Sequence, residues 1–548
     1  MSVLGKKWVI KNPDLKKDTI EKLLENRKDL DMNKVEVFND PYLFTDMEKA
    51  INRVKEAIDK GEKIIVFGDY DVDGITGAAI LVQALKYVNA NVSFRLPNRE
   101  KDGYGLSMKF IDEFIDKDIK LIITVDCGIS CANQVTKAHE NGIDTIITDH
   151  HNIPDIKPDD AIAIIHPKLD EQYPYKELTG AGVALKFAQA LIKDNQALLD
   201  SLVDLAALGT VADLGPLTGE NRLIVKQGLN SLPTTTWAGL QKLMELASID
   251  TSSKFNTGTV GFQIAPRINA AGRIGDPYKA LFLLLQEDPG KINTLGKELE
   301  DLNETRKTMT TQSIDDVEEM ISKYEGEMLP IIIEESDKWH VGIIGLVAGK
   351  LTEKYYRPAI IMTQLGDLFV ASARSVKGFN MVDALSNCKE HLVTYGGHYM
   401  AAGFSLKKEN LQEFKNAMKT YAKEQSENMD MVPTIEIDCE LDQKEIGHAL
   451  FEKIDELSPF GIGNQKPKFL FKGIKPEFID QVGNGKDHIR FAINIDNSRL
   501  GVIGFGLGQF ADEMKKHSNI DLVATIERNQ WKDQISIQLN ALDFKGNS

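Results

Sequence analysis

KIIVFGDYDVDGITGAAILVQALKYV, residues 63–88, leads from a short apolar run into a cluster of aspartates and then into a helical pattern. The run KIIVF is typical of a strand that is buried on both faces, and the glycine and aspartates after it mark its end. The same organisation returns in KLIITVDCG (120–128) and DTIITDHH (144–151), and shorter runs occur in ANVSFRLP (90–97) and AIAIIHPK (161–168). Apolar strands separated by helical patterns predict a parallel sheet that is covered by helices.

The rest of the chain predicts further parts. Residues 180–290 show helical patterns, and the polar stretch from Lys291 to Tyr324 is typical of a helix that bridges two domains. A second, smaller alternation of strands and helices begins at LPIIIEES (329–336), and short strands follow one another from Thr434 onward. We therefore expect an α/β protein with a catalytic domain and N-terminal extension over residues 1–290, a connecting helix over 291–325, a second α/β domain over 326–430 and an OB-like β-barrel over 431–548.

Acidic and imidazole side chains stand where the strands of the first sheet are expected to end. They are Asp69, Asp71 and Asp73 after KIIVF, Asp126 after LIITV, Asp149, His150 and His151 after TIIT, and Asp213 at the end of a helical pattern. The first three alternate, so in an extended segment they would project to one side. In an open parallel sheet the carboxyl ends of the strands form the ligand crevice. The sequence therefore predicts that these groups meet at one edge of the sheet.

Carboxylates that are gathered in one crevice repel each other unless cations neutralise them. A mixed set of aspartate and histidine without thiolates suits Mn²⁺ or Mg²⁺ better than structural zinc. Two such ions, which lower the pKa of a bridging water and neutralise phosphate charge, are a common apparatus for phosphodiester hydrolysis. We thus expect a metal-dependent phosphodiesterase.

Each acidic residue alone has a plainer interpretation. A single aspartate after a strand is more often a turn or helix-cap residue. The DxDxDG spacing also resembles a calcium-binding EF-hand loop, but that loop needs a preceding helix and a glutamate where this chain has Ile80. Only the joint pattern, with acids or imidazoles after three strands, favours a metal site.

Composition narrows the class of protein. The 548 residues are 42% hydrophobic and carry a formal net charge of −17, which lowers the expectation of non-specific binding to duplex nucleic acid. No apolar run is long enough for a membrane span or a signal peptide. The four cysteines show neither a disulfide framework nor zinc-ribbon spacing, so we expect a cytoplasmic protein with no membrane partner.

At these residues the chain resembles the DHH phosphoesterase superfamily. The matching motifs are GDYDVDG (68–74), TVDCG (124–128), TDHH (148–151), TVADLGPL (210–217) and the glycine-histidine motif GGHYMAAGFS (396–405). APRINAAGR (265–273), DKWHVGIIGLVAGK (337–350), ASARS (371–375) and LSPFGIGNQKPKF (457–469) narrow the resemblance to the RecJ family of single-stranded-DNA-specific exonucleases.

The resemblance implies roles for the clustered acids and imidazoles. Two divalent ions, Mn²⁺ or Mg²⁺, would be bound by Asp71, Asp73, Asp126, His150 and Asp213, with Asp126 bridging them. Asp69 would be a further metal ligand or would lie next to one. His151 would either contact the metal ligands without binding a metal itself or lie against the scissile phosphate. Phe67 stands where some DHH proteins have a histidine ligand, which leaves the coordination of one ion open.

The resemblance also implies a site for the 5′-terminal phosphate and therefore cutting in the 5′→3′ direction with release of 5′-mononucleotides. Its candidate residues are Arg99, Arg273, Ser372, Arg374, Gly397 and His398, with Arg267 as a further lining residue. Glycine lets backbone N–H groups approach a phosphate, and arginine supplies a fork of donors. The alternative for Arg99 and Arg273 is pairing with helix acids.

Nucleobase contacts are harder to assign from the sequence. Tyr104 or Phe379 would stack on a base, although single aromatic residues more often belong to the core. In the expected barrel, His488, Arg490 and Phe491 are candidates for contact with a single strand.

Other functions remain open at this point. One is hydrolysis of short oligonucleotides or cyclic dinucleotides, and another is a catalytically inactive DHH protein that acts as a DNA-binding scaffold. RecJ-like enzymes act in recombination and repair, so single-stranded DNA is the expected partner, together with single-strand-binding protein and a RecQ-like helicase. We expect a monomer.

Overall fold

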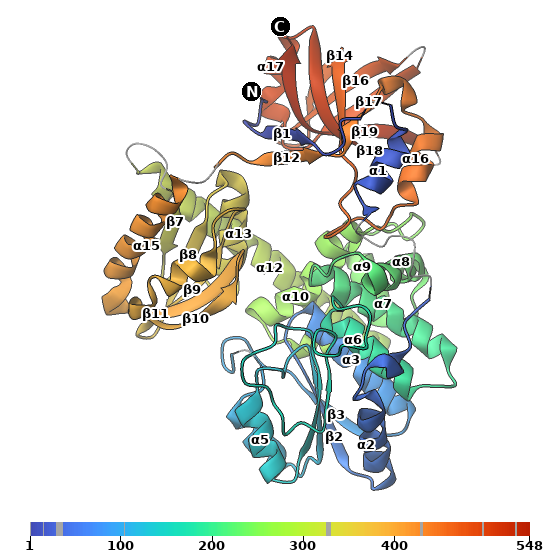
Figure 1. Ribbon diagram of the computed structural model, residues 1–548, viewed down its shortest axis with the longest axis vertical. Coiled ribbons are helices and arrows are strands. Elements are labelled where there is room, and N and C mark those ends of the chain that lie inside the picture. Colours follow the sequence, from blue (N-terminus) through green and yellow to red (C-terminus); the bar gives the residue numbers. More distant parts are fainter. Residues whose placement is uncertain are drawn as a thin grey trace. The chain divides into compact units, whose positions relative to one another are not determined.

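The computed structural model describes residues 2–14, 16–28, 37–103, 105–324, 330–427, 431–495, 498–531 and 534–547 (Figure 1). The chain divides into two compact units, a larger one of Val37–Pro216 and Glu220–Met431 and a smaller one that includes Val432–Ser548. None of the helices in the described residues is long and apolar enough to cross a membrane.

A five-stranded parallel sheet forms the first part of the larger unit. Its strand order is β3-β2-β4-β5-β6, and the strands are β2 (Lys63–Gly68), β3 (Asn91–Arg95), β4 (Leu121–Val125), β5 (Asp144–Thr148) and β6 (Ala163–Ile165). The central strands β2, β4 and β5 are almost entirely buried, as expected for a sheet that is covered on both faces. Figure 1 shows α2 (Met47–Asp59) on one side of this sheet and α5 (Ala132–Glu140) on the other. The parallel sheet that the sequence predicts is confirmed.

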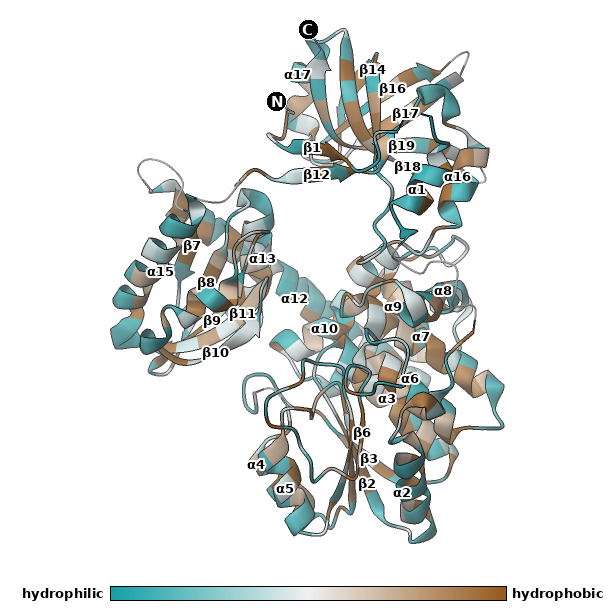
Figure 2. Ribbon diagram, viewed as in Figure 1, coloured by the Kyte–Doolittle hydropathy of each residue, from teal (hydrophilic) through white to brown (hydrophobic). Residues whose placement is uncertain are grey.

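Helices separate the strands of this sheet and follow the last of them in the sequence. They are α3 (Val72–Tyr87), α4 (Met108–Asp116), α6 (Gly180–Leu191), α7 (Gln196–Ala212), α8 (Gly219–Ser231), α9 (Ala238–Leu246), α10 (Ala265–Ile274) and α11 (Tyr278–Leu285). The helix α3 is buried along nearly its whole length because α6 and α7 pack against it. Figure 2 shows hydrophobic residues along the strands and hydrophilic residues on the surface of α2. The polar stretch expected to bridge two domains is the helix α12 (Pro289–Ser322), which begins after the cap residue Asp288.

A second sheet of five strands lies in the same unit, in the order β10-β11-β9-β8-β7. Its strands are β7 (Ile332–Glu335), β8 (Ala359–Leu365), β9 (Leu368–Arg374), β10 (Leu392–His398) and β11 (Ala401–Lys407). Only β7 and β8 are parallel, and the other neighbours pair in antiparallel fashion. The helices α13 (Ile344–Tyr355), α14 (Met381–Ser386) and α15 (Leu411–Ser426) complete this second α/β part.

The smaller unit contains a seven-stranded sheet in the order β13-β14-β18-β19-β17-β16-β15. The strands are β13 (Cys439–Glu440), β14 (Phe469–Ile474), β15 (Glu477–Val482), β16 (His488–Ile495), β17 (Ser498–Gly504), β18 (Asn519–Trp531) and β19 (Gln534–Asn547), with helices α16 (His448–Asp455) and α17 (Ala511–Lys515). The last two strands are long and pair with each other along their whole length. This sheet is the β-rich C-terminal domain that the sequence predicts.

The N-terminal residues lie in the smaller unit, which corrects the expected catalytic range of 1–290. The strand β1 (Lys7–Ile10) pairs in parallel with β12 (Thr434–Ile437). On α1 (Thr19–Glu25), Leu23 is fully buried in the hydrophobic core of the C-terminal sheet. Arg27 donates to Asp438 at 3.0 Å. Pairing between strands so far apart in the sequence depends on tertiary structure, which periodicity does not report.

Candidate metal centre

The turn after β2 carries the first aspartates. Asp69 follows the strand directly and is 3% exposed, while the side chain of Asp71 caps α3 by accepting from Gly74 N at 3.1 Å. Asp73 lies in the first turn of that helix. The expected alternation along an extended segment is therefore wrong beyond Asp71, because the helix begins at Val72. Gly74 is required in this turn, since a Cβ there would lie 2.6 Å from the backbone of Asp69.

Asp126 follows β4 and enters the same edge of the sheet. Its backbone adopts a left-handed conformation with φ of 58°, which is uncommon outside glycine but which aspartate adopts more often than most residues. The backbone N–H donates to Thr148 O at 3.0 Å at the end of the adjacent strand β5. The carboxylate is thus held at the ends of two neighbouring strands, and the residue is only 3% exposed.

Asp149, His150 and His151, which follow β5, have different roles. Asp149 is buried and accepts from Ile129 N at 2.9 Å, from His150 N at 2.7 Å and from His151 Nδ1 at 2.8 Å. Burial opposes the charge of this carboxylate, but the hydrogen bond from His151 and those from the backbone lower the pKa of Asp149 to about 2. Burial lowers the pKa of His151, but the hydrogen bond to Asp149 and the negative charge of Asp149 raise it to about 9. Asp149 therefore orients the two histidines.

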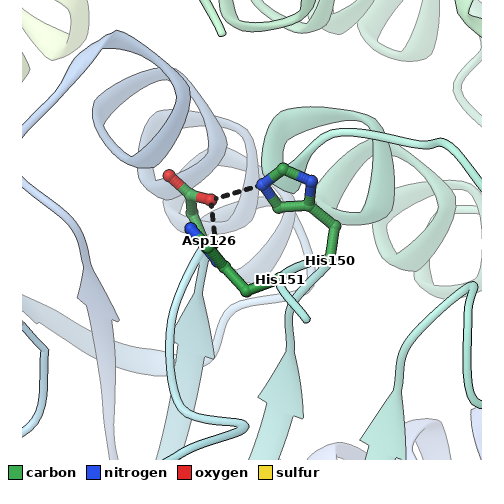
Figure 3. Close-up of side chains that lie close together, drawn as sticks. All are labelled: Asp126, His150 and His151. Carbon is green, nitrogen blue, oxygen red and sulfur yellow. Dashed lines mark ion pairs between the residues drawn. The ribbon is translucent and has the colours of Figure 1, made fainter. Parts of the chain in front are cut away.

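The structure brings the predicted acids and imidazoles together in three overlapping groups, each with ligand atoms within 4.8 Å of one another. The groups are Asp126, His150 and His151; Asp73, His150 and Asp213; and Asp69, Asp71 and Asp126. Figure 3 shows the first group, with the Asp126 carboxylate facing both imidazoles. The atom Nε2 of His150 lies 3.0 Å from Asp126 Oδ1, 3.8 Å from Asp73 Oδ2 and 3.7 Å from Asp213 Oδ2. Asp126 and His150 each belong to two groups, so the groups adjoin.

The charges of the centre are those of a cation site. Burial, and then repulsion by neighbouring carboxylates, raise the pKa of Asp69 and Asp126 well above the ordinary value and the pKa of Asp73 to about 7. Burial lowers the pKa of His150 to about 3, so its imidazole is neutral and able to donate a lone pair. Oxygen and imidazole donors without a thiolate fit Mn²⁺ or Mg²⁺. These donor groups therefore fit divalent cations.

Backbone groups of α6 complete the centre, and sequence reasoning missed them. Asp73 Oδ2 accepts from Gly180 N at 2.6 Å and Oδ1 accepts from Ala181 N at 2.9 Å. A Cβ at Gly180 would lie 2.5 Å from the Cβ of Asp126, and one at Gly209 would lie 2.5 Å from Asp73 Oδ1. The signal in the sequence was the run LTGAGVA (178–184), in which Thr179 precedes small residues at the start of a helix.

Phe67, at the position where some DHH proteins have a histidine, points into the core. It is fully buried, and its ring centroid lies 5.2 Å from that of Phe110 and 6.4 Å from that of Phe114. An apolar ring offers no lone pair to a cation. Phe67 therefore adds no ligand to the groups described above.

Basic residues from separate segments also meet in the larger unit. Arg374 Nη1 donates to Ser372 Oγ at 3.1 Å on β9. The guanidinium of Arg99 lies over the ring of Tyr70, at 4.4 Å from its centroid. Burial, followed by repulsion from Arg99, lowers the pKa of Arg273 to about 10, and the same two causes lower the pKa of Arg374. The three arginines thus lie close enough to repel each other, as expected of a site for an anion.

Arg267 has different interactions from Arg99, Arg273 and Arg374. It pairs with Glu300 of α12 through two contacts of 2.5 and 2.9 Å. Pairing with a helix acid, which the sequence analysis raised for Arg99 and Arg273, is thus found at Arg267. The expectation that it lines the anion site is wrong.

The hairpin of β10 and β11 carries the glycine-histidine motif. Gly397 has φ of 144°, and a Cβ there would lie 2.5 Å from Ala402 Cα, so the hairpin needs glycine at this position. His398 Nδ1 lies 3.1 Å from Asn152 Nδ2, and Asn152 directly follows His151. The motif therefore contacts the loop that leaves the metal centre.

The candidates for contact with bases or single strands differ in whether the structure buries or exposes them. Phe379 and Phe491 are 3% and 2% exposed and belong to the cores of their domains, so the expectation that they stack on bases is wrong. Arg490 is exposed and lies 3.5 Å from Asp480, and the ring of His488 contacts Phe505 edge-on. Tyr104 lies outside the described residues.

Comparison with protein families matches three parts of the chain. Residues 63–210 match the N-terminal domain of the DHH family, residues 329–424 match the DHHA1 domain, and residues 437–543 match the RecJ OB domain. The metal centre lies in the first part, apart from Asp213, which caps the helix at its end.

Curated relatives and solved structures extend the match to nearly the whole chain. The single-stranded-DNA-specific exonuclease RecJ of Bacillus subtilis is 37% identical over 96% of this chain and 66% of its own length, and that of Escherichia coli is 32% identical over 91% and 88%. The crystal structure of Thermus thermophilus RecJ in complex with Mn²⁺ superimposes with a TM-score of 0.82 at 29% identity, covering 99% of this chain and 80% of the other. A structure of exonuclease RecJ bound to manganese covers 71% of this chain and 98% of its own, with a TM-score of 0.62 and 34% identity. The chain carries DHH, DHHA1 and RecJ OB domains in that order and belongs to the RecJ family.

Proposed function

We propose that the chain is a single-stranded-DNA-specific exonuclease that hydrolyses phosphodiester bonds from the 5′ end, releases 5′-mononucleotides and acts in DNA recombination and repair. The observation that carries the proposal is the pair of adjoining groups Asp69, Asp71, Asp126 and Asp73, His150, Asp213. Their donors would hold two divalent ions, and the two groups adjoin where Asp126 Oδ1 lies 3.0 Å from His150 Nε2. The names of the relatives support DNA as the substrate.

The residues of the chain would divide the work in the following way. When bound, divalent ions supply an activated water and neutralise charge on the phosphate. His150 presents Nε2 to them as a neutral donor, and the N–H groups of Gly180 and Ala181 fix both oxygens of Asp73. His151 is protonated near neutral pH and donates from Nδ1 to Asp149, so an N–H at Nε2 serves as a donor to a phosphate oxygen.

The direct test is digestion of a single strand that is labelled at either its 5′ or its 3′ end, with Mn²⁺, Mg²⁺ or a chelator. Release of labelled mononucleotide from the 5′ label at the earliest times, with no release in chelator, is the expected result. Early release from the 3′ label would contradict the direction of cutting. A dinucleotide and a duplex of the same sequence complete the set, because consumption of the dinucleotide alone would identify a hydrolase of short oligonucleotides instead.

Arg374 provides a prediction for recognition of the 5′ end. In Arg374→Gln the preference for a 5′-phosphorylated over a 5′-hydroxyl strand is expected to fall about 10- to 100-fold, since a hydrogen bond to a charged group contributes about 1.5–3 kcal/mol. Comparison of kcat/KM for the two strands measures it. Arg357→Gln is the matched control, because Arg357 donates to the backbone carbonyl of Tyr356 in the same unit. Equal loss on both strands would show that Arg374 does not read the terminal phosphate.

Partners and location follow from this function as further proposals. Single-strand-binding protein and a RecQ-like helicase would supply unpaired strands, and we propose that the protein acts as a monomer in the cytoplasm. The cysteines support a reducing compartment, since Cys127, Cys131, Cys388 and Cys439 are free and buried. Sedimentation of the purified protein and co-purification with each partner test these points.

A further inference from the structure

Phe262 exposes 85% of its surface, more than any other large apolar side chain in the described part of the chain. It lies in the π-helical segment η4 (Thr259–Ile264), which runs directly into α10. Segments of this kind are rare and occur frequently at functional sites. A ring exposed to this extent has its faces available for stacking on a partner.

The segment η4 packs against the end of α7 that leads to the metal centre. A Cβ at Gly261 would lie 3.8 Å from Val211 Cγ1, an ordinary van der Waals contact. Val211 comes two residues before Asp213, the residue that caps α7 and joins the group of Asp73 and His150. Phe262, next to Gly261 in the chain, therefore lies in a segment that contacts the helix whose end carries Asp213.

Leu214 is a second exposed apolar residue, and it lies next to Asp213 in the chain. Leu214 directly follows Asp213, is 65% exposed and has φ of 61°, a conformation that is strained for a bulky residue. The turn is fixed by hydrogen bonds from Leu214 N to Val211 O at 3.3 Å and from Gly215 N to Thr210 O at 3.0 Å. The backbone strain thus keeps an apolar group in water beside an exposed carboxylate.

The chemistry of the bound strand supplies a fitting occupant. A strand whose phosphate lies in the metal centre carries nucleobases within a few ångströms on either side, and every base has a flat face that stacks on an aromatic ring. In duplex DNA those faces are already covered by neighbouring base pairs. An exposed ring at this place therefore suits an unpaired nucleobase.

We propose that Phe262 stacks on an unpaired nucleobase of the strand in the metal centre and that Leu214 contacts the same nucleotide. The inference rests on the proposed function and adds a base-binding site to it. Phe262 precedes Arg273 by eleven residues along η4 and α10, or about 16.5 Å at 1.5 Å per residue. At about 3.4 Å per nucleotide in a stacked strand, and more in an extended one, the stacked base belongs to the second to fifth nucleotide from the phosphate bound by Arg273.

The test compares steady-state kinetics of Phe262→Ala, Phe262→Leu and Phe262→Trp with the unchanged protein on a 5′-phosphorylated single strand. Stacking is worth about 10-fold in binding, so KM is expected to rise about 10-fold in the alanine variant at unchanged kcat. Tryptophan should restore the KM, and leucine should fall between alanine and phenylalanine. Leu365→Ala, at an exposed position at the end of β8, is the matched control and should behave like the unchanged protein.

A second measurement locates the base without relying on turnover. Strands with 2-aminopurine at each of the first six positions are bound in chelator, which prevents metal-dependent hydrolysis, and their fluorescence is read. Quenching at one of positions two to five that is lost in Phe262→Ala is the expected result. Quenching that is equal in both proteins at every position would overturn the proposal. An unchanged KM of Phe262→Ala together with a lower melting temperature would also overturn it, because the ring would then pack on the protein. If the unchanged protein cuts no single strand, the proposed function fails, and the fluorescence still decides whether Phe262 stacks on a base.

Discussion

Asp126→Asn is expected to abolish metal-dependent hydrolysis, with a fall in rate of about 10³- to 10⁴-fold, and at the same time to stabilise the metal-free protein. The loss follows because Asp126 belongs to two of the groups that could hold a metal ion and adjoins the third through His150. The amide keeps the shape of the side chain but carries no charge to attract a cation. Single-turnover hydrolysis of a labelled strand in Mn²⁺ measures the first effect.

The gain in stability follows from the electrostatics of the carboxylates around Asp126 when chelator keeps metal ions away. Burial and the carboxylates of Asp73, Asp71 and Asp69 raise the pKa of Asp126 well above that of an unfolded chain. In the pH range between the two values the folded state holds a proton that the unfolded chain has released, so the stability of the metal-free protein falls as the pH rises. Asparagine removes this contribution, and the melting temperature in chelator at pH 8 should rise.

The matched control is Asp204→Asn. Asp204 is also a buried aspartate with a raised pKa, but its carboxylate accepts from Ser231, outside the metal centre. Added Mn²⁺ should raise the melting temperature of this control as it does in the unchanged protein, and should leave Asp126→Asn unmoved. A full response of Asp126→Asn to Mn²⁺, together with normal turnover, would exclude Asp126 as a ligand.

The sequence predicted those features that depend on local pattern. Buried parallel strands leave continuous apolar runs, and the rule that ligands bind at the carboxyl ends of such strands placed Asp69, Asp126 and His150 at one edge. The structure brings these residues together. The motifs that follow the strands were sufficient to recognise the family, because each motif combines a strand end with a polar side chain.

Features that depend on packing between distant segments were not predictable. The pairing of β1 with β12 joins residues more than 400 positions apart, and no periodicity records it. The role of Asp149 in orienting the histidines was not predicted, because it rests on hydrogen bonds from Ile129 and His151. The exposure of Phe262 was equally hidden, since an aromatic residue in a helical pattern normally belongs to the core.

The second large effect on the rate of hydrolysis is expected for Gly180→Ala, because α6 approaches Asp126 closely. The added Cβ would lie 2.5 Å from the Cβ and 2.8 Å from Oδ1 of Asp126, closer than real side chains come. Either the carboxylate turns away or the start of α6 retreats, and a retreat weakens the hydrogen bond from Gly180 N to Asp73 Oδ2. A displacement of about 1 Å at a reacting centre costs on the order of 100-fold in rate, so kcat should fall by about that factor.

Gly182→Ala separates this effect from a general response of the helix. A Cβ at Gly182 would meet only the far end of the Leu178 side chain, at 3.2 Å, and that side chain is flexible enough to give way. Both substitutions remove a glycine from the first turn of α6, which by itself favours folding by about 0.5–1 kcal/mol. We therefore expect Gly182→Ala to keep its activity and its stabilisation by Mn²⁺, whereas Gly180→Ala stays folded and loses both. Equal activity of the two variants would mean that the contact between α6 and Asp126 does not position the metal centre.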